Sequence, residues 1–325
     1  MIGILHVTSK VGKITQRINS GKSHRGFVSW LVFLSESLFQ ALEAAIKATA
    51  PGDFRIQRVV PVSGGDINRA YQLQTKSGRY FAKVNDAPQA PQMFVAESTG
   101  LAMLRQTVGI RAPQPFMAGQ AHRDAFLLME WIDAAGKHSE AGQAALGRML
   151  AALHSQHRET FGLDHDNFIG RLPQANTPSA DWTAFFIGQR LQKQLDIAQH
   201  TYSQAGLRAS FDRLFARLGS LYPQEPPSLL HGDLWGGNYL VDAAGQPALI
   251  DPAVYYGHRE ADIAMTKLFG GFSTHFYAAY HEAYPLQAGW EARMDLWNLY
   301  PLLVHLNLFG ASYLGAIQRS LKRYV

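Results

Sequence analysis

The chain of 325 residues contains no cysteine. This absence excludes disulfide bonds, thiolate catalysis, zinc sites built on cysteine and iron–sulfur clusters. Charged residues are also scarce, at 17% of the sequence, whereas long disordered segments are usually rich in charge. Apolar residues make up 47%, which is ordinary for a globular protein with a full core. We therefore expect a folded chain, long enough for one large domain or two lobes.

Acidic residues are missing from the N-terminal end. The whole chain has a net charge of +5, but residues 1–35 hold five basic residues and no acidic one. The remainder contains 25 basic and 25 acidic residues. Because binding to nucleic acid relies on a basic surface, this neutral remainder predicts that the protein does not bind nucleic acid.

Long hydrophobic runs are absent as well. The apolar run from Gly26 to Leu34 is too short to cross a bilayer, which takes about 20 apolar residues, and no other segment qualifies. We predict a cytoplasmic protein that is not associated with a membrane. Basic residues before a short apolar run also resemble an export or targeting signal, and this is the alternative interpretation. Since no small-residue cleavage site follows, we expect residues 1–35 to be a poorly ordered extension, such as an early start-codon assignment would add.

What remains divides into a strand-rich part and a helix-rich part. Strands are predicted in the first part by alternating apolar residues between turn signals, at residues 56–62, 70–74, 80–84, 116–118 and 126–130. Helical spacing predicts helices at residues 36–49, 91–106, 143–154, 182–200 and 207–221. We predict an α+β protein with a small β-rich N-lobe over residues 36–132 and a larger helical C-lobe over residues 133–325.

The most informative segment is His231-Gly232-Asp233-Leu234-Trp235-Gly236-Gly237-Asn238. It places an aspartate five residues before an asparagine, and a predicted hairpin then ends at Asp251. This order of Asp, Asn and Asp is typical of phosphoryl transfer in kinase-like enzymes. One carboxylate takes the proton of the acceptor hydroxyl, while the amide oxygen and the second carboxylate bind Mg²⁺, which prefers oxygen ligands. We predict Asp233 as the catalytic base and Asn238 and Asp251 as metal ligands.

Three further residues are predicted to support or extend this loop. The ring of His231 is expected to bond to the backbone and fix the loop. Asp262 either caps the start of a helix or reaches back to brace the loop, and the two roles can coexist. Trp235 stands where Ser/Thr protein kinases have a lysine, and its flat ring beside two glycines suits the apolar face of a sugar. Packing of the loop is an equally supported interpretation of Trp235.

Candidate nucleotide-binding residues lie in the strand-rich lobe. Gly64 and Gly65 follow a predicted strand, and paired glycines let backbone N–H groups approach phosphates, although such pairs are also common in simple hairpin turns. Lys83 lies on a strand between apolar residues, and Glu97 on the next helix offers it an acidic partner. A strand lysine paired with a helix glutamate orients the nucleotide phosphates in kinases, so we predict this pair here.

The change from strands to helices falls at residues 127–132, which would form the hinge between the lobes. In kinase-like folds, adenine binds to backbone groups of the hinge between apolar side chains. Glu130 and Ile132 are therefore predicted to contact the nucleotide. An ordinary buried strand remains the alternative for this segment.

Beyond these motifs, the chain resembles the fructosamine kinase (ketosamine-3-kinase) family, in the aminoglycoside phosphotransferase-like branch of the kinase fold. The resemblance runs from about residue 36 to the C-terminus. It is carried by four segments: residues 230–242 with their Trp-Gly-Gly-Asn, residues 250–260, Asp166-Asn167-Phe168-Ile169-Gly170 with Pro173-Gln174, and Tyr300-Pro301-Leu302-Leu303-Val304-His305. Some relatives have a cysteine in the nucleotide-binding loop that responds to redox state, and this chain, without cysteine, lacks that form of regulation.

The resemblance implies an activity and a set of ligands. Members of the family use ATP and Mg²⁺ to phosphorylate the 3-hydroxyl of ketosamines such as fructosamines and ribulosamines, and the unstable product releases the sugar, which repairs glycation. The substrate would be a small ketosamine or a glycated protein. Carried over to this chain, the resemblance assigns to Asp233, Asn238, Asp251, Lys83 and Glu97 the roles given above. It also implies that Trp235 and the loop with Asn167 and Gln174 face the sugar.

Two alternatives remain open from the sequence. The first is another small-molecule kinase of this fold, acting on an aminoglycoside, choline or homoserine. The second is an inactive kinase-like binding module. A protein kinase is less well supported, because Pro252 follows Asp251 where Asp-Phe-Gly would be expected, and there is no Ala-Pro-Glu segment. The sequence does not indicate an oligomeric state.

Overall fold

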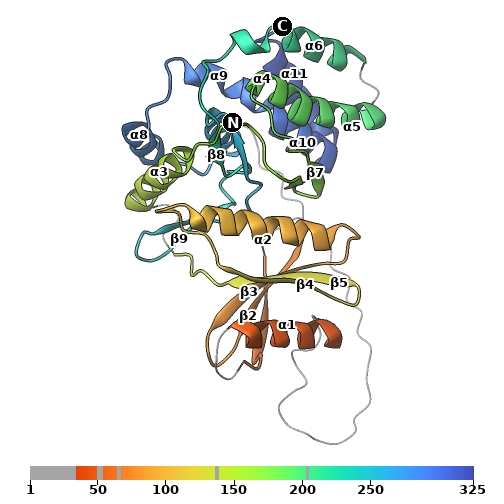
Figure 1. Ribbon diagram of the computed structural model, residues 1–325, viewed down its shortest axis with the longest axis vertical. Coiled ribbons are helices and arrows are strands. Elements are labelled where there is room, and N and C mark those ends of the chain that lie inside the picture. Colours follow the sequence, from red (N-terminus) through yellow and green to blue (C-terminus); the bar gives the residue numbers. More distant parts are fainter. Residues whose placement is uncertain (1–33, 50–53, 64–66, 136–138, 203–204) are drawn as a thin grey trace, which may run out of the picture.

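A computed structural model describes residues 34–49, 54–63, 67–135, 139–202 and 205–325. Most of the predicted N-terminal extension thus lies outside the described residues. The chain forms two lobes, a sheet flanked by two helices and a larger part built mainly of helices (Figure 1). This arrangement confirms the predicted α+β architecture with two lobes. Among the residues described, no helix is both long and apolar enough to pass through a bilayer.

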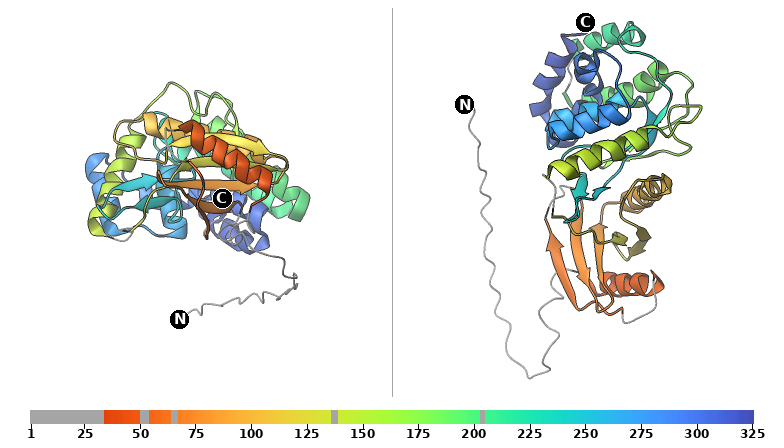
Figure 2. Two further views of the ribbon diagram at one scale, coloured as in Figure 1. Left: turned by 90° about the horizontal axis from the view of Figure 1, so that it is seen from below. Right: turned by 90° about the vertical axis from the view of Figure 1, so that its left-hand side faces the viewer.

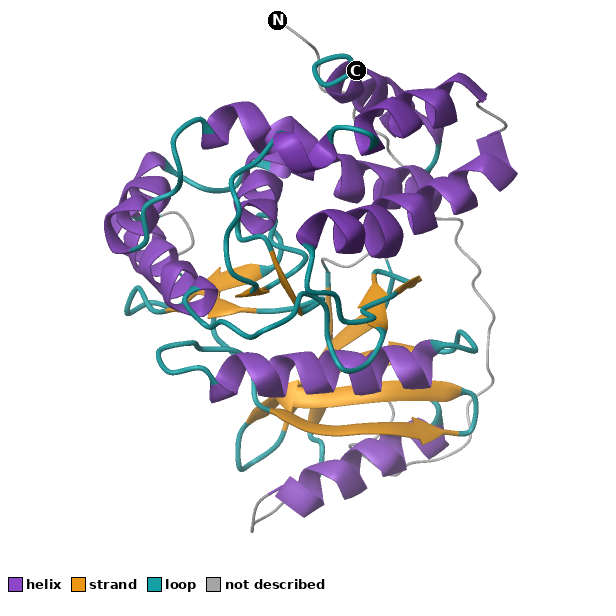
Figure 3. Cartoon of the chain, turned by 45° about the horizontal axis from the view of Figure 1, so that its top comes forward, coloured by secondary structure: helices purple, strands orange, loops and turns teal. Residues whose placement is uncertain are grey.

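The sheet lobe contains one antiparallel sheet of five strands in the order β1-β2-β3-β5-β4. Its strands are β1 (Arg58–Val62), β2 (Arg69–Gln74), β3 (Arg79–Asn85), β4 (Pro115–Ala121) and β5 (Asp124–Glu130). All five predicted strands are present, each within a few residues of its predicted bounds. Helix α1 (Glu36–Thr49) covers one face of the sheet and α2 (Ala90–Gln106) covers the other (Figure 3).

The two faces of the sheet belong to two separate hydrophobic cores. Since successive side chains of a strand point to opposite faces, Phe126 and Leu128 pack with α1, whereas Leu127 and Met129 pack on the α2 side. The α1 core contains residues of the sheet lobe alone, but the α2 core continues into the helical lobe. Contact between the lobes is close at Gly100 of α2, where an added Cβ would lie 3.4 Å from side-chain atoms of Pro252 and Val254.

The helical lobe is an assembly of helices in which α3 and α8 lie side by side (Figure 2). Its α-helices are α3 (Glu140–His154), α4 (Trp182–Phe185), α5 (Gln192–Tyr202), α6 (Ala205–Phe215), α7 (Glu260–Phe269), α8 (Thr274–Ala283), α9 (Trp290–Trp297), α10 (Leu299–Phe309) and α11 (Leu314–Leu321). The single helix predicted over residues 182–200 is instead divided by a π-helical segment, η1 (Phe186–Leu191). The prediction missed this segment because no proline marks the π-helical turn, and the one glycine within it, Gly188, is tolerated inside a helix.

Short two-stranded sheets hold the loops that face the sheet lobe. They pair β8 (Ser228–Leu230) with β11 (Tyr255–Gly257), β9 (Tyr239–Val241) with β10 (Pro247–Leu249), and β6 (Asn167–Ile169) with β7 (Leu172–Gln174). The loop after β8 and the loop after β10 carry the residues that the sequence analysis singled out. Pairing of these short strands therefore fixes where those residues lie.

Candidate active site

Asp233 and Asn238 lie on the loop between β8 and β9, and the structure brings their side chains together. The Asn238 Nδ2 group donates hydrogen bonds to the Asp233 carboxylate at 2.9 Å and to the Asp233 carbonyl at 2.8 Å. A backbone bond of 3.0 Å from Ile250 N to Asn238 O ties this loop to the segment that precedes Asp251. The loop is thus closed on itself, with the Asp233 carboxylate held in one orientation.

Asp262 braces the same loop from the first turn of α7. Its carboxylate accepts hydrogen bonds from the backbone N–H groups of His231 at 2.7 Å and Gly232 at 2.9 Å. It also lies 3.2 Å from Nε2 of the buried His154. Burial opposes the charged form of Asp262, but the bonds from His154 and the loop lower its pKa below the ordinary value. Of the two predicted roles, the bracing contact is the one that the hydrogen bonds show.

The ring of His231 makes the predicted bond to the backbone. Its Nε2 lies 2.9 Å from the carbonyl oxygen of Ile250, and its Nδ1 lies 3.2 Å from the N–H of Asp233. Both bonds form only when Nε2 carries the proton and Nδ1 accepts. Burial lowers the pKa of His231, which favours this neutral ring. His231 therefore links the loop of Asp233 to the strand that leads to Asp251.

Gly232 allows the loop to pass close to its neighbour. Its φ is +81°, and an added Cβ would lie 2.1 Å from the carbonyl oxygen of Ala253. A side chain at this position would meet both the penalty of the left-handed conformation and a clash with the backbone. Only glycine fits, so this residue sets the position of Asp233, which follows it.

Asp251 also has a positive φ of +55°. Non-glycine residues seldom adopt this conformation, and such strain concentrates at functional sites where the surroundings enforce it. The strained turn directs the Asp251 carboxylate toward the sheet lobe, where its Oδ1 lies 2.7 Å from Lys83 Nζ.

Lys83 connects the two lobes, because its ammonium group forms ion pairs with two carboxylates. Besides Asp251, its Nζ contacts Glu97 Oε1 of α2 at 2.7 Å. Lys83 is buried, which opposes its charge, but the two carboxylates raise its pKa above the ordinary value. The predicted pair of Lys83 with Glu97 is present, and the contact with Asp251 adds a link that the sequence did not indicate.

The Asp233 carboxyl group has a strongly raised pKa. Surrounding protein and the nearby charge of Asp251 raise its pKa to about 7, although the bond from Asn238 opposes this shift. A carboxylate with such a pKa is a stronger base than an ordinary aspartate, and it still releases its proton near neutral pH. Asp233 is therefore chemically suited to accept a proton from an alcohol.

The donor atoms near Asp233 suit a hard cation. Because Asn238 donates through Nδ2, its Oδ1 points away from Asp233 and is available as a ligand, and Asp251 has a second oxygen beyond the one on Lys83. Within the described ranges there is no group of three or more His, Cys, Asp or Glu side chains placed to hold a metal. A cation bound by Asn238 and Asp251 would need its other ligands from phosphate oxygens and water, as is usual for Mg²⁺.

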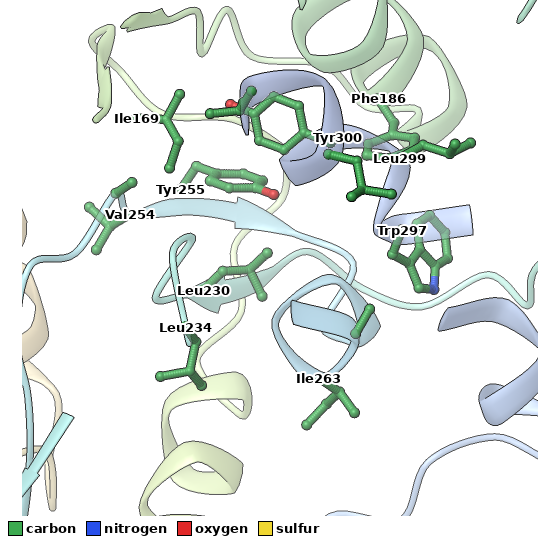
Figure 4. Close-up of a cluster of buried hydrophobic side chains, with 14 of the residues drawn as sticks. Ile169, Phe186, Leu230, Leu234, Val254, Tyr255, Ile263, Trp297, Leu299 and Tyr300 are labelled. Atoms are coloured by element: carbon green, nitrogen blue, oxygen red, sulfur yellow. The ribbon is translucent and has the colours of Figure 1, made fainter. Parts of the chain in front are cut away.

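A small cavity of about 20 Å³ opens beside Asp233. Its lining includes Ile169, Phe186, Tyr255 and Tyr300, which Figure 4 shows in one cluster. Trp235 is not part of this lining; its side chain is 41% exposed and lies over Gly237. The indole therefore packs on the loop and also offers an open face, so its predicted contact with a sugar stays a prediction.

Asn167 and Gln174 do not face an open site, contrary to what the resemblance implied. Both are buried. The Asn167 amide donates to Val254 O at 2.8 Å and accepts from Gln174 Nε2 at 2.8 Å, while Gln174 Oε1 accepts from the Tyr300 hydroxyl at 2.7 Å. Since their polar atoms are engaged within the protein, we reinterpret both residues as supports for the segment after Asp251 and for Tyr300.

The structure gives less information on the other residues that were predicted to bind the nucleotide. Gly64 and Gly65 lie outside the described residues. Glu130 ends β5, and its carboxylate accepts a hydrogen bond from Gln114 N at 3.1 Å, while the Ile132 side chain is buried. The hinge segment thus follows the C-terminal end of β5, an inner strand of the sheet, and contact of Glu130 and Ile132 with a nucleotide stays a prediction.

Two residues of the site were missed from the sequence. His154 holds Asp262 from α3, and Tyr300 reaches the cavity from α10. His154 falls at the end of an amphipathic pattern, where a histidine is usually a surface residue, so no local signal marked it. Tyr300 belongs to a segment that carried the family resemblance, and that segment was the available signal.

Comparisons with known proteins agree on one family. A sequence model described as fructosamine kinase matches residues 38–325. A "Probable ketoamine kinase" of Lactiplantibacillus plantarum is 44% identical over 83% of this chain and 95% of the relative. A chloroplastic protein-ribulosamine 3-kinase of Arabidopsis thaliana is 40% identical, with 83% of each chain covered. A crystal structure from Thermobifida fusca, provisionally assigned as a fructosamine-3-kinase, has a TM-score of 0.77 and 33% identity, covering 89% of this chain and 98% of that one.

Proposed function

Since this chain belongs to the fructosamine kinase family, we propose that it is an ATP-dependent kinase that phosphorylates the 3-hydroxyl of ketosamines such as fructosamines and ribulosamines. Phosphorylation makes the ketosamine unstable, so that the sugar is released and the amine is restored, which repairs glycation. The names of the bacterial and plant relatives support this substrate class. The observation that carries the proposal is the position of Lys83, 2.7 Å from both Glu97 and Asp251, at the boundary of the lobe that holds Asp233.

Asp233 is the base in this proposal. With a pKa raised to about 7, its carboxylate takes the proton of the sugar hydroxyl as the hydroxyl oxygen forms its bond to the terminal phosphorus of ATP and ADP leaves. Asn238 keeps the carboxylate oriented, and Asp262 keeps the backbone of the loop in place. Positioning of this kind supplies most of the catalysis in phosphoryl transfer, because the protein does little covalent work.

Lys83 is proposed to contact the phosphates of the nucleotide, and Glu97 holds it in position. Asn238 and Asp251 would hold Mg²⁺, and their free oxygens fit a hard cation. When bound, Mg²⁺ neutralises charge on the phosphates during transfer. Glu130, Ile132, Gly64 and Gly65 complete the proposed nucleotide site, and Trp235 is proposed to lie against the sugar.

The acceptor is tested with purified full-length protein, ATP and Mg²⁺. Fructosyl-lysine and ribulosyl-lysine are compared with kanamycin and choline, and with a glycated protein as a larger acceptor. Release of ADP measures turnover, and mass spectrometry with ³¹P NMR identifies the phosphorylated position. We expect turnover on the ketosamines and phosphate on their 3-hydroxyl.

Other outcomes point to other functions. Turnover confined to kanamycin or choline would identify a different small-molecule kinase. Binding of nucleotide with Mg²⁺ but no phosphorylation of any acceptor would support an inactive binding module. A comparison of free and protein-bound ketosamines at equal concentration would show which of the two is the better substrate.

A further inference from the structure

Arg190 is a buried cation without an acidic partner. Its side chain is fully buried in η1, and in the part of the chain that the structure describes, no carboxylate lies within ion-pair distance of it. Arg259, another buried arginine, differs in this respect, because Glu225 accepts two bonds of 2.8 Å from its guanidinium. A buried charge without a counter-ion is unfavourable, so the position of Arg190 calls for an explanation other than ion pairing.

Aromatic rings and neutral oxygens surround the Arg190 guanidinium. Its central carbon lies 3.9 Å from the centre of the Tyr255 ring and 5.5 Å from that of Tyr300. Its Nη2 donates to Asn176 Oδ1 at 2.7 Å, and its Nη1 donates to the carbonyl of Ala175. The Nε atom is buried and finds no hydrogen-bond partner among the residues that the structure describes. Arg190 is therefore held mainly by cation–π contacts and by the segment that follows β7.

These contacts place Arg190 directly behind the cavity at Asp233. Tyr255 and Tyr300 line that cavity, as does Phe186, which belongs to the same π-helical segment as Arg190. Arg190 itself is not part of the lining. The Tyr255 and Tyr300 rings thus separate the guanidinium from the space beside Asp233 (Figure 4 shows both rings).

Arg190 also joins the buried amide network. Asn176, which accepts its hydrogen bond, donates in turn to Asn167 Oδ1 at 2.9 Å, and Asn167 donates to Val254 O at 2.8 Å. Val254 lies between Asp251 and Tyr255. One side chain therefore touches both the rings that line the cavity and the amides that hold the segment from Asp251 to Tyr255.

We propose that Arg190 is a positioning residue that shapes the acceptor site. It fixes the Tyr255 and Tyr300 rings so that the sugar hydroxyl meets Asp233 in a productive position. The π-helical turn, a feature common at functional sites, carries both Arg190 and Phe186. The proposal concerns the acceptor, since Arg190 contacts rings that line the cavity beside Asp233 and reaches the segment of Asp251 only indirectly, through Asn176 and Asn167. Its kinetic test rests on the proposed function.

The test uses two variants of the full-length protein. Arg190→Met removes the charge and keeps a long side chain, and Arg190→Lys keeps the charge but loses the planar group. For Arg190→Met, we expect the KM for the ketosamine to rise about tenfold or more, because displaced Tyr255 and Tyr300 rings would misplace the acceptor. The KM for ATP should change less than about twofold. Arg190→Lys should show the same split with a smaller rise, about threefold, because lysine cannot stack or fork its hydrogen bonds as arginine does.

Leu214→Ala is the matched control. Leu214 is fully buried in α6 and does not line the cavity. Its truncation should therefore lower Tm without displacing the residues that line the cavity beside Asp233. If Arg190→Met lowers Tm like the control and leaves both KM values unchanged, or raises them equally, Arg190 is only structural and the proposal is wrong. If Arg190→Met does not fold, the split between the two KM values in Arg190→Lys decides.

A crystal structure of Arg190→Lys separates this proposal from the proposed function. If the wild-type protein phosphorylates no ketosamine, the proposed function fails, but the geometry can still be tested. Displaced Tyr255 and Tyr300 rings in the variant would support the positioning role. Rings in their original places would overturn it.

Discussion

The two lobes bury different kinds of side chain. Among the described residues, Lys83, Asn85 and Thr107 are the only buried polar side chains of the sheet lobe, and all the others lie in the helical lobe. The core packed around α1 consists of aliphatic residues and Phe126, together with Tyr71 and Tyr80. The helical lobe instead encloses ion pairs, such as Arg259 with Glu225 and Arg293 with Glu260.

The two lobes therefore hold their candidate functional side chains in place in different ways. An apolar sheet can hold one charge, Lys83, in a fixed place, because its neighbours Ala82 and Val84 are packed in the core. A loop such as that of Asp233 has no such packing on every side, so it must be fixed by hydrogen bonds: Asn238 donates to Asp233, while His231 Nδ1 and the Asp262 carboxylate accept from backbone N–H groups of the loop. We therefore expect changes in the sheet lobe to affect nucleotide use or stability, and changes in the loops of the helical lobe to affect the chemical step.

Asp233→Ala should produce the largest effect on turnover. Without a base, kcat should fall at least about 10³-fold, while ADP binding measured by calorimetry stays within about threefold, because the nucleotide contacts lie elsewhere. Asp212→Ala, at an exposed aspartate of α6, is the control and should retain normal turnover. Turnover retained by Asp233→Ala would remove Asp233 as the base and break the proposed division of tasks.

Lys83→Ala should act on the nucleotide instead. Loss of a charged contact to the phosphates should lower kcat/KM for ATP about 10- to 100-fold, measured at saturating ketosamine. The ketosamine KM should change little. Lys193→Ala removes an exposed lysine and serves as the control. An equal loss for both substrates would show that Lys83 acts on the whole site.

Gly232→Ala should have an intermediate effect and can be compared with Gly245→Ala. Both glycines have a left-handed backbone, with φ of +81° and +76°, but an added Cβ at Gly245 would meet nothing within 4 Å. Both variants should lose about 1–2 kcal/mol of stability through strain, and Gly232→Ala should lose more than Gly245→Ala because of its clash with Ala253. Only Gly232→Ala should also lower kcat, about tenfold, because the clash with Ala253 displaces Asp233. Equal kcat values in the two variants would contradict this account.

Leu42→Ala should have the smallest effect on turnover. Leu42 is fully buried in the α1 core, so the cavity should cost about 2–5 kcal/mol of stability in urea unfolding. Below the unfolding transition, both KM values should stay within about twofold of the wild-type values. A large change in the ketosamine KM would show that the α1 core is coupled to the acceptor site after all.

The sequence predicted the parts of the site that local motifs encode. Asp233, Asn238 and Asp251 lie on loops whose composition and spacing are typical of kinase-like enzymes, and the Lys83–Glu97 pair follows from one strand and the next helix. The five strands of the sheet were found because alternation and turn signals are local as well. The sequence alone thus identifies the candidate residues. Their roles stay predictions until the variants above are measured.

Properties that depend on burial could not be predicted in this way. Asn167 and Gln174 are polar residues in a turn-rich segment, and only the folded chain shows that their amides are enclosed beside Tyr300. The contact of Lys83 with Asp251 joins residues 168 positions apart in a sequence without any marker of that distance. Arg190 stands in an ordinary helical pattern, and its lack of an acidic partner is a property of the tertiary structure.

The close approach of α2 to the segment after Asp251 has a consequence for control of the protein. At Gly100, the helix that carries Glu97 rests on Pro252 and Val254, so a rotation of α2 that broke the Lys83–Glu97 contact would also open a gap against the other lobe. We expect Lys83 to stay aligned with Glu97 in the resting protein, without help from an activating subunit or a covalent modification. The rate of phosphorylation would then depend on the concentration of the ketosamine substrate.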